Sequence, residues 1–209
     1  MNNNLILAST VLVLRDLNNK LEVLMVRRSK KPPFQNLHVF PGGKIDHDDS
    51  IKELEAFTDG INDEIASNIL GIEDGGLSFW IASIRECFEE VGILLAQKKS
   101  GEKLDFISSE KTKYENYRKM LVKNEINLLE ICQKEDLVLS TVNIAPLSHW
   151  ITPNIETKRF DTRFFIAYLP ENQIVKHDEV ELTQSIWINP LDAIKKAYEG
   201  EMHMIMPTI

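Results

Sequence analysis

The stretch FWIASIRECFEEVG, residues 79–92, constrains the fold of this chain more than any other. At about 100° per residue its apolar side chains form one stripe of a helix, and Glu86, Glu89 and Glu90 share an opposite arc of about 100°. Like charges one turn apart repel each other, and no basic partner is expected within the arc. The pattern predicts a helix that ends at Gly92, where a glycine suits the left-handed cap.

The three glutamates on this arc have two interpretations. The simpler one is an amphipathic helix whose outer face is acidic. Carboxylates that converge without basic partners are better explained by a divalent cation, and oxygen ligands suit Mg²⁺ or Mn²⁺. The chain has no cluster of cysteine and histidine that would indicate zinc. The sequence therefore predicts that the glutamates bind Mg²⁺ or Mn²⁺.

Strand-like runs surround the helix. LILASTVLVLR and LEVLMVRR flank Asn18 and Asn19, which tolerate positive φ, so a hairpin is expected. The run RFDTRFFIAYL, residues 159–169, is apolar on both faces, as in a strand covered by helices on both sides. Further strands are expected at LHVF, HWITP and TQSIWIN, and further helices near 111–124 and after Pro190. The predicted fold class is α/β (α+β), with a mixed sheet between helices.

Composition limits the remaining possibilities. The chain has 209 residues, 43% of them apolar, which suits one domain over 1–209. No run approaches the roughly 18 apolar residues of a membrane span, and the first residues lack a basic region and a cleavage site. Cys87 and Cys132 give no disulfide framework, so the cytoplasm is expected. The net charge of −8 argues against nonspecific binding to nucleic acid.

Residues 50–77 form a distinct insertion before the helix. Ile51, Leu54 and Phe57, followed by Ile61, Ile65 and Ile69, recur at helical spacing among many acids, which predicts one or two amphipathic helices. The turn at Pro41-Gly42-Gly43, on the other side of the insertion, lets the backbone come close to another group.

The stretch RECFEEVGI, residues 85–93, together with FPGG at 40–43, resembles the Nudix box, G-x5-E-x7-R-E-U-x-E-E-x-G-U, where U is aliphatic. Asp49 stands at the first glutamate of that pattern, and residues 50–84 replace its spacer of seven. An interruption at this place resembles the branch of the nucleoside diphosphate-linked moiety X motif 19 type. Three further stretches resemble the same branch: ASIRECFEEVGILL at 82–95, WITP at 150–153 and RFDTRFFIAY at 159–168. The stretch HDEVELTQSIWINP at 177–190 extends the resemblance over most of the chain. The chain is thus identified as a member of the Nudix hydrolase superfamily.

The resemblance implies a Nudix fold and metal-dependent hydrolysis of a diphosphate joined to another moiety. Two or more Mg²⁺ or Mn²⁺ ions would neutralise charge on the substrate and lower the pKa of a bound water. The implied metal ligands are Glu86, Glu89, Glu90 and the backbone carbonyl of Gly43 or Gly42. Arg85 is implied to orient a box carboxylate, with Asp49 as its partner.

The catalytic base is left open by the family, because some members use a box glutamate and others use an acid from a later loop. Glu179 and Glu181 are the late candidates, and Glu181 joins Arg85, Glu86, Glu89 and Glu90 in the predicted catalytic set. The alternative for both late acids is an exposed loop position. His177 is interpreted as a surface histidine.

The branch implies a small nucleotide-type substrate, namely coenzyme A or acyl-coenzyme A, cleaved to 3′,5′-ADP and (acyl-)phosphopantetheine. A 3′-phosphate requires basic groups, and the predicted substrate-binding residues are Arg27, Arg28, Phe40, Lys44 and Arg163. The run RRSKK at 27–31 is alternatively a solvated loop. Only Arg27 is in register with the upstream signature of another coenzyme A branch, and Arg163 is alternatively part of an ion pair at a strand edge.

Other functions remain open at this point. Within the enzyme class, the substrate could be ADP-ribose, NADH or another nucleoside diphosphate derivative. From a different class, a Nudix-fold module could sense such a ligand without cleaving it, but the presence of all three helix glutamates argues against this. The insertion is expected either to shape the leaving-group side as a lid or to form a homodimer contact through Ile61, Ile65 and Ile69.

Overall fold

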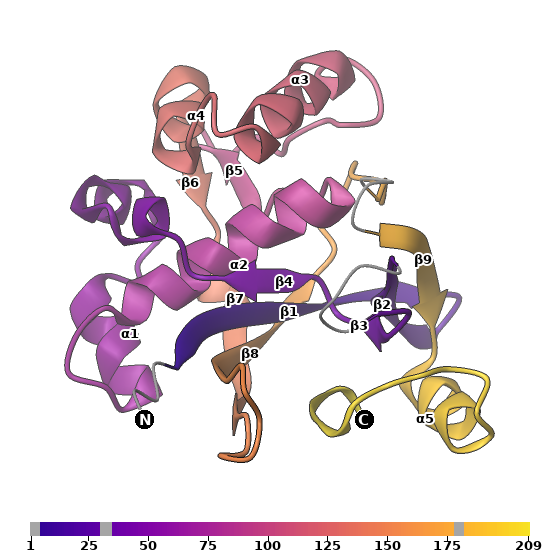
Figure 1. Ribbon diagram of the computed structural model, residues 1–209. Helices are drawn as coiled ribbons and strands as arrows, with labels where there is room; N and C mark the ends of the chain where they lie inside the picture. Colours follow the sequence, from indigo (N-terminus) through magenta and orange to yellow (C-terminus); the bar gives the residue numbers. More distant parts are fainter. Residues whose placement is uncertain (1–4, 30–34, 178–181) are drawn as a thin grey trace.

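A mixed seven-stranded sheet with the long helix α2 (Gly76–Val91) over one face forms the centre of the computed structural model, which describes residues 5–29, 35–177 and 182–209 (Figure 1). The strand order is β3-β2-β1-β8-β7, while β4 pairs with β1 and β9 pairs with β2. Strands β1 and β8 run parallel, and the other pairs are antiparallel. The strands are β1 (Ile6–Leu17), β2 (Lys20–Arg28), β3 (His38–Val39), β4 (Gly42–Lys44), β7 (Ile144–Ile151), β8 (Phe160–Tyr168) and β9 (Leu182–Ile188). The predicted mixed sheet is confirmed.

The hairpin between β1 and β2 forms at the expected place. Leu17 pairs with Lys20, and the two residues between them, Asn18 and Asn19, have φ values of 54° and 60°. A two-residue turn of this kind needs positive φ at both central positions, which asparagine tolerates better than most residues. The prediction from the paired asparagines is confirmed.

Strand β8 divides two apolar clusters. Phe165 faces α2, where its ring centre lies 4.6 Å from that of Trp80. Phe164 joins a smaller cluster on the opposite face, which is covered by α5 (Pro190–Tyr198). Tyr168, at the end of the strand, is 67% exposed. The expectation of a strand covered on both faces is therefore correct for its centre and wrong for this end.

A second layer lies on the far side of α2 from the sheet (Figure 1). It contains α3 (Lys111–Val122), α4 (Leu128–Glu135) and a two-stranded sheet of β5 (Ala96–Lys98) and β6 (Leu137–Leu139). The predicted helix near 111–124 is confirmed as α3, and the predicted last helix begins at Pro190. The sequence did not predict α4 or the small sheet, because β5 and β6 are too short to show a clear period.

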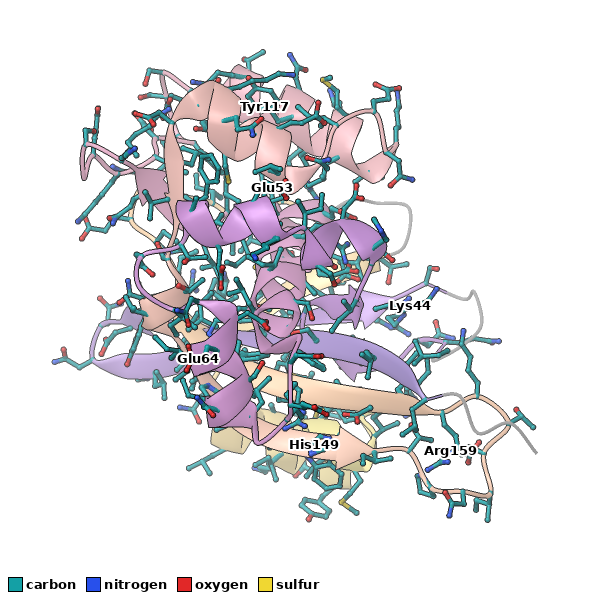
Figure 2. The ribbon with its side chains drawn as sticks, turned by 90° about the vertical axis from the view of Figure 1, so that its left-hand side faces the viewer. Lys44, Glu53, Glu64, Tyr117, His149 and Arg159 are labelled. Atoms are coloured by element: carbon teal, nitrogen blue, oxygen red, sulfur yellow. The ribbon has the colours of Figure 1, made fainter. Side chains whose placement is uncertain are left out.

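The insertion folds into the 3₁₀ helix η2 (Lys52–Phe57) and the helix α1 (Asp63–Leu70), preceded by the 3₁₀ turn η1 (His47–Ser50). Figure 2 labels Glu53 on η2 and Glu64 on α1, at the front of that view. The predicted helical character is confirmed, and Ile51, Leu54, Phe57 and Ile61 pack in or against the core as expected. The predicted apolar stripe is wrong for its last two members. Ile65 and Ile69 are 43% and 49% exposed, because α1 packs on α2 through the smaller side chains of Ala66 and Ser67.

Helices long and apolar enough to cross a bilayer are absent from the described residues.

Candidate active site

The glycine turn brings backbone directly against the acidic arc of α2. Ser9 of β1 pairs with Gly43, so the edge of the sheet holds β4 beside the helix. A Cβ atom added at Gly43 would lie 2.2 Å from Oε1 of Glu86, which only a glycine avoids. The backbone N–H of Gly42 donates to Oε2 of Glu90 at 3.0 Å. The close approach expected from this turn is confirmed.

Arg85 joins the two halves of the interrupted box. Its Nε and Nη2 donate to Oδ1 and Oδ2 of Asp49, both at 2.8 Å, and Nη2 also donates to the carbonyl of Lys44 at 2.9 Å. Arg85 and Asp49 are 5% and 2% exposed. A two-pronged arginine–carboxylate pair fixes both partners in one orientation. The pairing expected from the resemblance is confirmed.

Arg85 also contacts the glutamates of its own helix. Its Nη1 donates to Oε1 of Glu86 at 3.0 Å and to Oε1 of Glu89 at 3.3 Å. Glu90 lies 3.6 Å from Nη1 of Arg28 on β2. The expectation that the acidic arc has no basic partner is therefore wrong. Arg85 begins just outside the arc, but its long side chain reaches Glu89 one turn further on.

Burial sets the electrostatics of this cluster. It raises the pKa of Glu86 to about 7, although Arg85 lowers it, and the charge of Glu89 raises it further. Burial also raises the pKa of Glu89 and of Asp49, again against the effect of Arg85. A buried carboxylate with a raised pKa is stabilised by additional positive charge. Arg85 thus compensates only part of the negative charge of the buried carboxylates.

The donor set fits a hard divalent cation. Three glutamates beside a backbone turn offer only oxygen atoms, which are the ligands of Mg²⁺ and Mn²⁺. Within 5–29, 35–177 and 182–209, no three Asp, Glu, His or Cys side chains converge as a ready-made ligand set. In this conformation Glu86 and Glu89 instead share the guanidinium of Arg85.

The predicted substrate-binding arginines on β2 are separated. Arg28 lies near Glu90, whereas Arg27 is paired across the strands with His38 of β3. Phe40 is 8% exposed and belongs to the cluster on the face opposite α2. Side chains of a strand alternate between its two faces, which explains why the neighbouring side chains of Arg27 and Arg28 lie apart. The structure thus brings Arg28 to the glutamates, and leaves Arg27 and Phe40 away from them.

The other predicted residues are dispersed. Lys44 is exposed on β4 (Figure 2). Arg163 lies under the insertion, where Nη1 donates to the carbonyl of Leu70 at 3.1 Å and Nε lies 3.8 Å from Asp161. The alternative of an ion pair therefore describes its contacts. Glu179 and Glu181 lie outside the described residues, and half-buried His177 is 3.2 Å from the hydroxyl of Ser185.

One residue beside the glutamates had no signal in the sequence. Arg118 on α3 donates to the backbone carbonyls of Glu89 and Glu90, both at 2.9 Å. A backbone carbonyl is the same in every residue, so a motif cannot reveal such a contact.

Known proteins share this architecture. A crystal structure of a Nudix hydrolase from Alicyclobacillus acidocaldarius matches with a TM-score of 0.80 at 24% identity, covering 100% of this chain and 90% of that one. This likeness shows that the chain has the Nudix fold.

Sequence relatives point to one branch. Acyl-coenzyme A diphosphatase NUDT19 of Xenopus laevis is 26% identical over 206 residues, covering 83% of this chain and 54% of that protein. Putative nudix hydrolase 7 of Caenorhabditis elegans is 25% identical, covering 90% of this chain and 53% of that protein. The chain thus spans about half the length of these relatives. The family model described as the NUDT19 Nudix domain matches residues 63–209, and the chain belongs to this family.

Proposed function

We propose that this chain is a Nudix pyrophosphohydrolase that uses Mg²⁺ or Mn²⁺ to cleave the diphosphate of coenzyme A or acyl-coenzyme A. The products would be 3′,5′-ADP and (acyl-)phosphopantetheine. The observation that carries this proposal is the closed box: Arg85 is hydrogen-bonded to Asp49 across the insertion and to Glu86 and Glu89 on its own helix, and Glu86 and Glu90 lie against the turn at Gly42 and Gly43. In this proposal residues 1–209 form one Nudix domain, and residues 50–77 are its insertion.

Each residue has a distinct part in the reaction. Glu86, Glu89, Glu90 and the carbonyl of Gly43 would hold two or more divalent ions. Such ions neutralise charge on a diphosphate and lower the pKa of a bound water. Arg85 keeps Glu86 and Glu89 oriented, and its pair with Asp49 keeps Arg85 itself in place.

The substrate and the base need separate support. Arg28, which lies 3.6 Å from Glu90, is proposed to bind the substrate phosphates, and exposed Lys44 on β4 is proposed as a second basic residue for them. Glu181 is proposed as the general base. The preference for coenzyme A rests on the names of the relatives, among them acyl-coenzyme A diphosphatase NUDT19 of Gallus gallus at 24% identity over 89% of this chain.

Product analysis tests the proposal. Purified protein is incubated with Mn²⁺ and, in parallel, coenzyme A, an acyl-coenzyme A, ADP-ribose or NADH, and the products are identified by mass spectrometry. Glu89→Gln is expected to abolish cleavage, whereas Glu53→Gln, an exposed change in the insertion, leaves it unchanged. Phosphopantetheine together with 3′,5′-ADP would support both the reaction and the substrate. Cleavage of ADP-ribose or NADH alone would replace the substrate, and binding without cleavage would identify a sensing module.

Labelled water and one further variant test the base. Hydrolysis in H₂¹⁸O shows which product phosphate takes up the oxygen and therefore which phosphorus is attacked. Glu181→Gln is expected to lower kcat by 10²-fold or more, the usual contribution of a general base. A Glu181→Gln enzyme with wild-type kcat would return the role to a box glutamate.

A further inference from the structure

The last turn of α2 has every one of its terminal carbonyls bonded. A helix leaves its final four carbonyls without partners inside the helix. Here the N–H of Gly92 donates to Phe88 at 3.0 Å and the N–H of Lys176 donates to Val91 at 2.9 Å. The two carbonyls between them, of Glu89 and Glu90, both accept from the side chain of Arg118.

Arg118 donates three hydrogen bonds to two separate parts of the chain, the end of α2 and the segment at Lys176. It extends from α3, donates through Nε to Glu89 and through Nη2 to Glu90, each at 2.9 Å, and donates through Nη1 to the carbonyl of Lys176 at 2.5 Å. Only a guanidinium offers this many donors in one rigid plane, and its charge also suits a helix C-terminus. Gly92 leaves room for the plane, since a Cβ there would lie 3.1 Å from Nη1.

The carbonyls that Arg118 holds belong to two of the three glutamates. The position of a carboxylate depends on its own backbone, and a metal site needs ligands held to within about 0.5 Å. We propose that Arg118 is a positioning residue that fixes Glu89 and Glu90 for binding of divalent cations. This inference rests on the proposed function, because it assumes that these glutamates are ligands.

The alternative is that Arg118 only caps the helix. A cap contributes to the free energy of unfolding and leaves the ligands unaffected once the protein is folded. Three variants separate the two roles. Arg118→Gln removes the guanidinium group and its charge, whereas Arg118→Lys keeps the charge but loses the guanidinium donors. Lys119→Gln is the control, because it removes the charge of the exposed neighbour on α3. For each, Tm is measured first, and the Mn²⁺ Kd and kcat are then measured well below the lowest Tm.

We expect Mn²⁺ affinity and kcat to decrease by different amounts in the two Arg118 variants. Changing a residue that orients metal ligands weakens metal affinity about 10- to 100-fold. Arg118→Gln should raise the Mn²⁺ Kd and lower kcat by about this factor. The Kd and kcat of Arg118→Lys should lie between those of Arg118→Gln and the wild type, and those of Lys119→Gln should match the wild type. Hydrogen exchange of the peptide containing Glu89 and Glu90 should become faster in the two Arg118 variants only.

Chemical rescue gives an independent readout. A cavity of about 220 Å³, lined by residues that include Phe88, Phe106, Tyr114 and Lys176, adjoins Arg118. Guanidinium ion added at millimolar concentration should therefore reach the space left in Arg118→Ala and partly restore Mn²⁺ affinity. The same addition should leave Lys119→Gln unchanged.

Two outcomes would overturn the inference, and they are distinguishable. Arg118 variants with a lowered Tm but a wild-type Mn²⁺ Kd and kcat would show that Arg118 is a structural cap. A wild-type protein that binds no Mn²⁺ and cleaves none of the four substrates would overturn the proposed function together with this inference.

Discussion

Arg85 and Asp49 hold each other by two hydrogen bonds of 2.8 Å although they lie 36 positions apart in the sequence. Asp49 directly precedes the insertion, and Arg85 lies inside α2 just after it. The chain between them leaves and returns to the same place, so the interrupted box is closed in space. Both partners are buried, which makes the site dependent on their remaining together.

Loss of this pair should be strongly destabilising. Asp49→Asn leaves Arg85 buried without its two-pronged partner, and breaking a buried pair in this way costs about 3–5 kcal/mol. Urea denaturation should show a lower midpoint with an unchanged m-value. Asp48→Asn is the matched control, because that neighbouring side chain is 54% exposed and should change the free energy of unfolding by less than about 0.5 kcal/mol. Equal midpoints for the two variants would refute the prediction.

Glu86→Gln should leave the thermal stability of the metal-free protein unchanged or raise it, but should lower the stability of the protein with bound metal. Burial raises the pKa of Glu86 to about 7, so its ionised form at pH 8 is disfavoured in the ion-free protein. Replacement by glutamine should therefore leave Tm unchanged or raise it when no metal is present. Mn²⁺ at a hundredfold excess over Kd should stabilise the wild type by about 2.7 kcal/mol, and this gain should be lost in the variant.

Thermal unfolding with Mn²⁺ and with EDTA measures both effects. Glu53→Gln, on the exposed side of η2, should retain the full rise in Tm on adding Mn²⁺. A Glu86→Gln protein that keeps this rise would remove Glu86 from the ligand set.

Features that depend on neighbouring residues could be predicted from the sequence. The hairpin follows from Asn18 and Asn19, and the end of α2 follows from Gly92, which has a φ of 74°. The pair of Arg85 and Asp49 follows from the spacing of a known motif. Each of these needs only local conformation or a fixed pattern.

Features that depend on tertiary packing could not be predicted. Arg27 and Arg28 are equally basic, and only the strand register decides which one meets Glu90. Ile65 and Ile69 have the right spacing for a buried stripe, but small residues give a closer approach between α1 and α2, so the isoleucines stay exposed. The closeness of that approach can be tested.

Gly76→Ala should destabilise the protein although it lies within a helix. Gly76 is the first residue of α2, and alanine normally stabilises a helix by at most about 1 kcal/mol relative to glycine. At this position the new Cβ would lie 2.3 Å from the backbone nitrogen of Ser67 and 2.5 Å from the carbonyl carbon of Ala66. The two helices would have to move apart, at a cost of about 1–3 kcal/mol.

The free energy of unfolding of Gly76→Ala, measured in urea, shows whether the substitution stabilises or destabilises the protein. Asn68→Ala is the control, because Asn68 is exposed on α1 and alanine there should leave stability unchanged or slightly higher. A stabilised Gly76→Ala protein would show that α1 does not press on α2.

His38 should make the protein less stable in mild acid. Burial lowers its pKa from 6.5, and the charge of Arg27 lowers it further, whereas a hydrogen bond with the backbone of His203 opposes this shift. Below about pH 6.5, His38 therefore becomes protonated in the unfolded chain while it is still neutral in the folded protein. The free energy of unfolding consequently decreases as the pH is lowered through this range. Between pH 7.5 and 5.5 the wild type should lose more stability than His38→Gln, which carries no titrating group.

Urea midpoints across this range test the sign. Replacing His47, whose side chain is 98% exposed, by glutamine should leave the pH dependence as in the wild type. Arg27→Gln should reduce the pH dependence, because it removes a charge that keeps His38 neutral. Parallel curves for the wild type and His38→Gln would mean that His38 binds its proton equally well in the folded and unfolded chains, and the burial of its ring beside Arg27 would then have no effect on the pH dependence of stability.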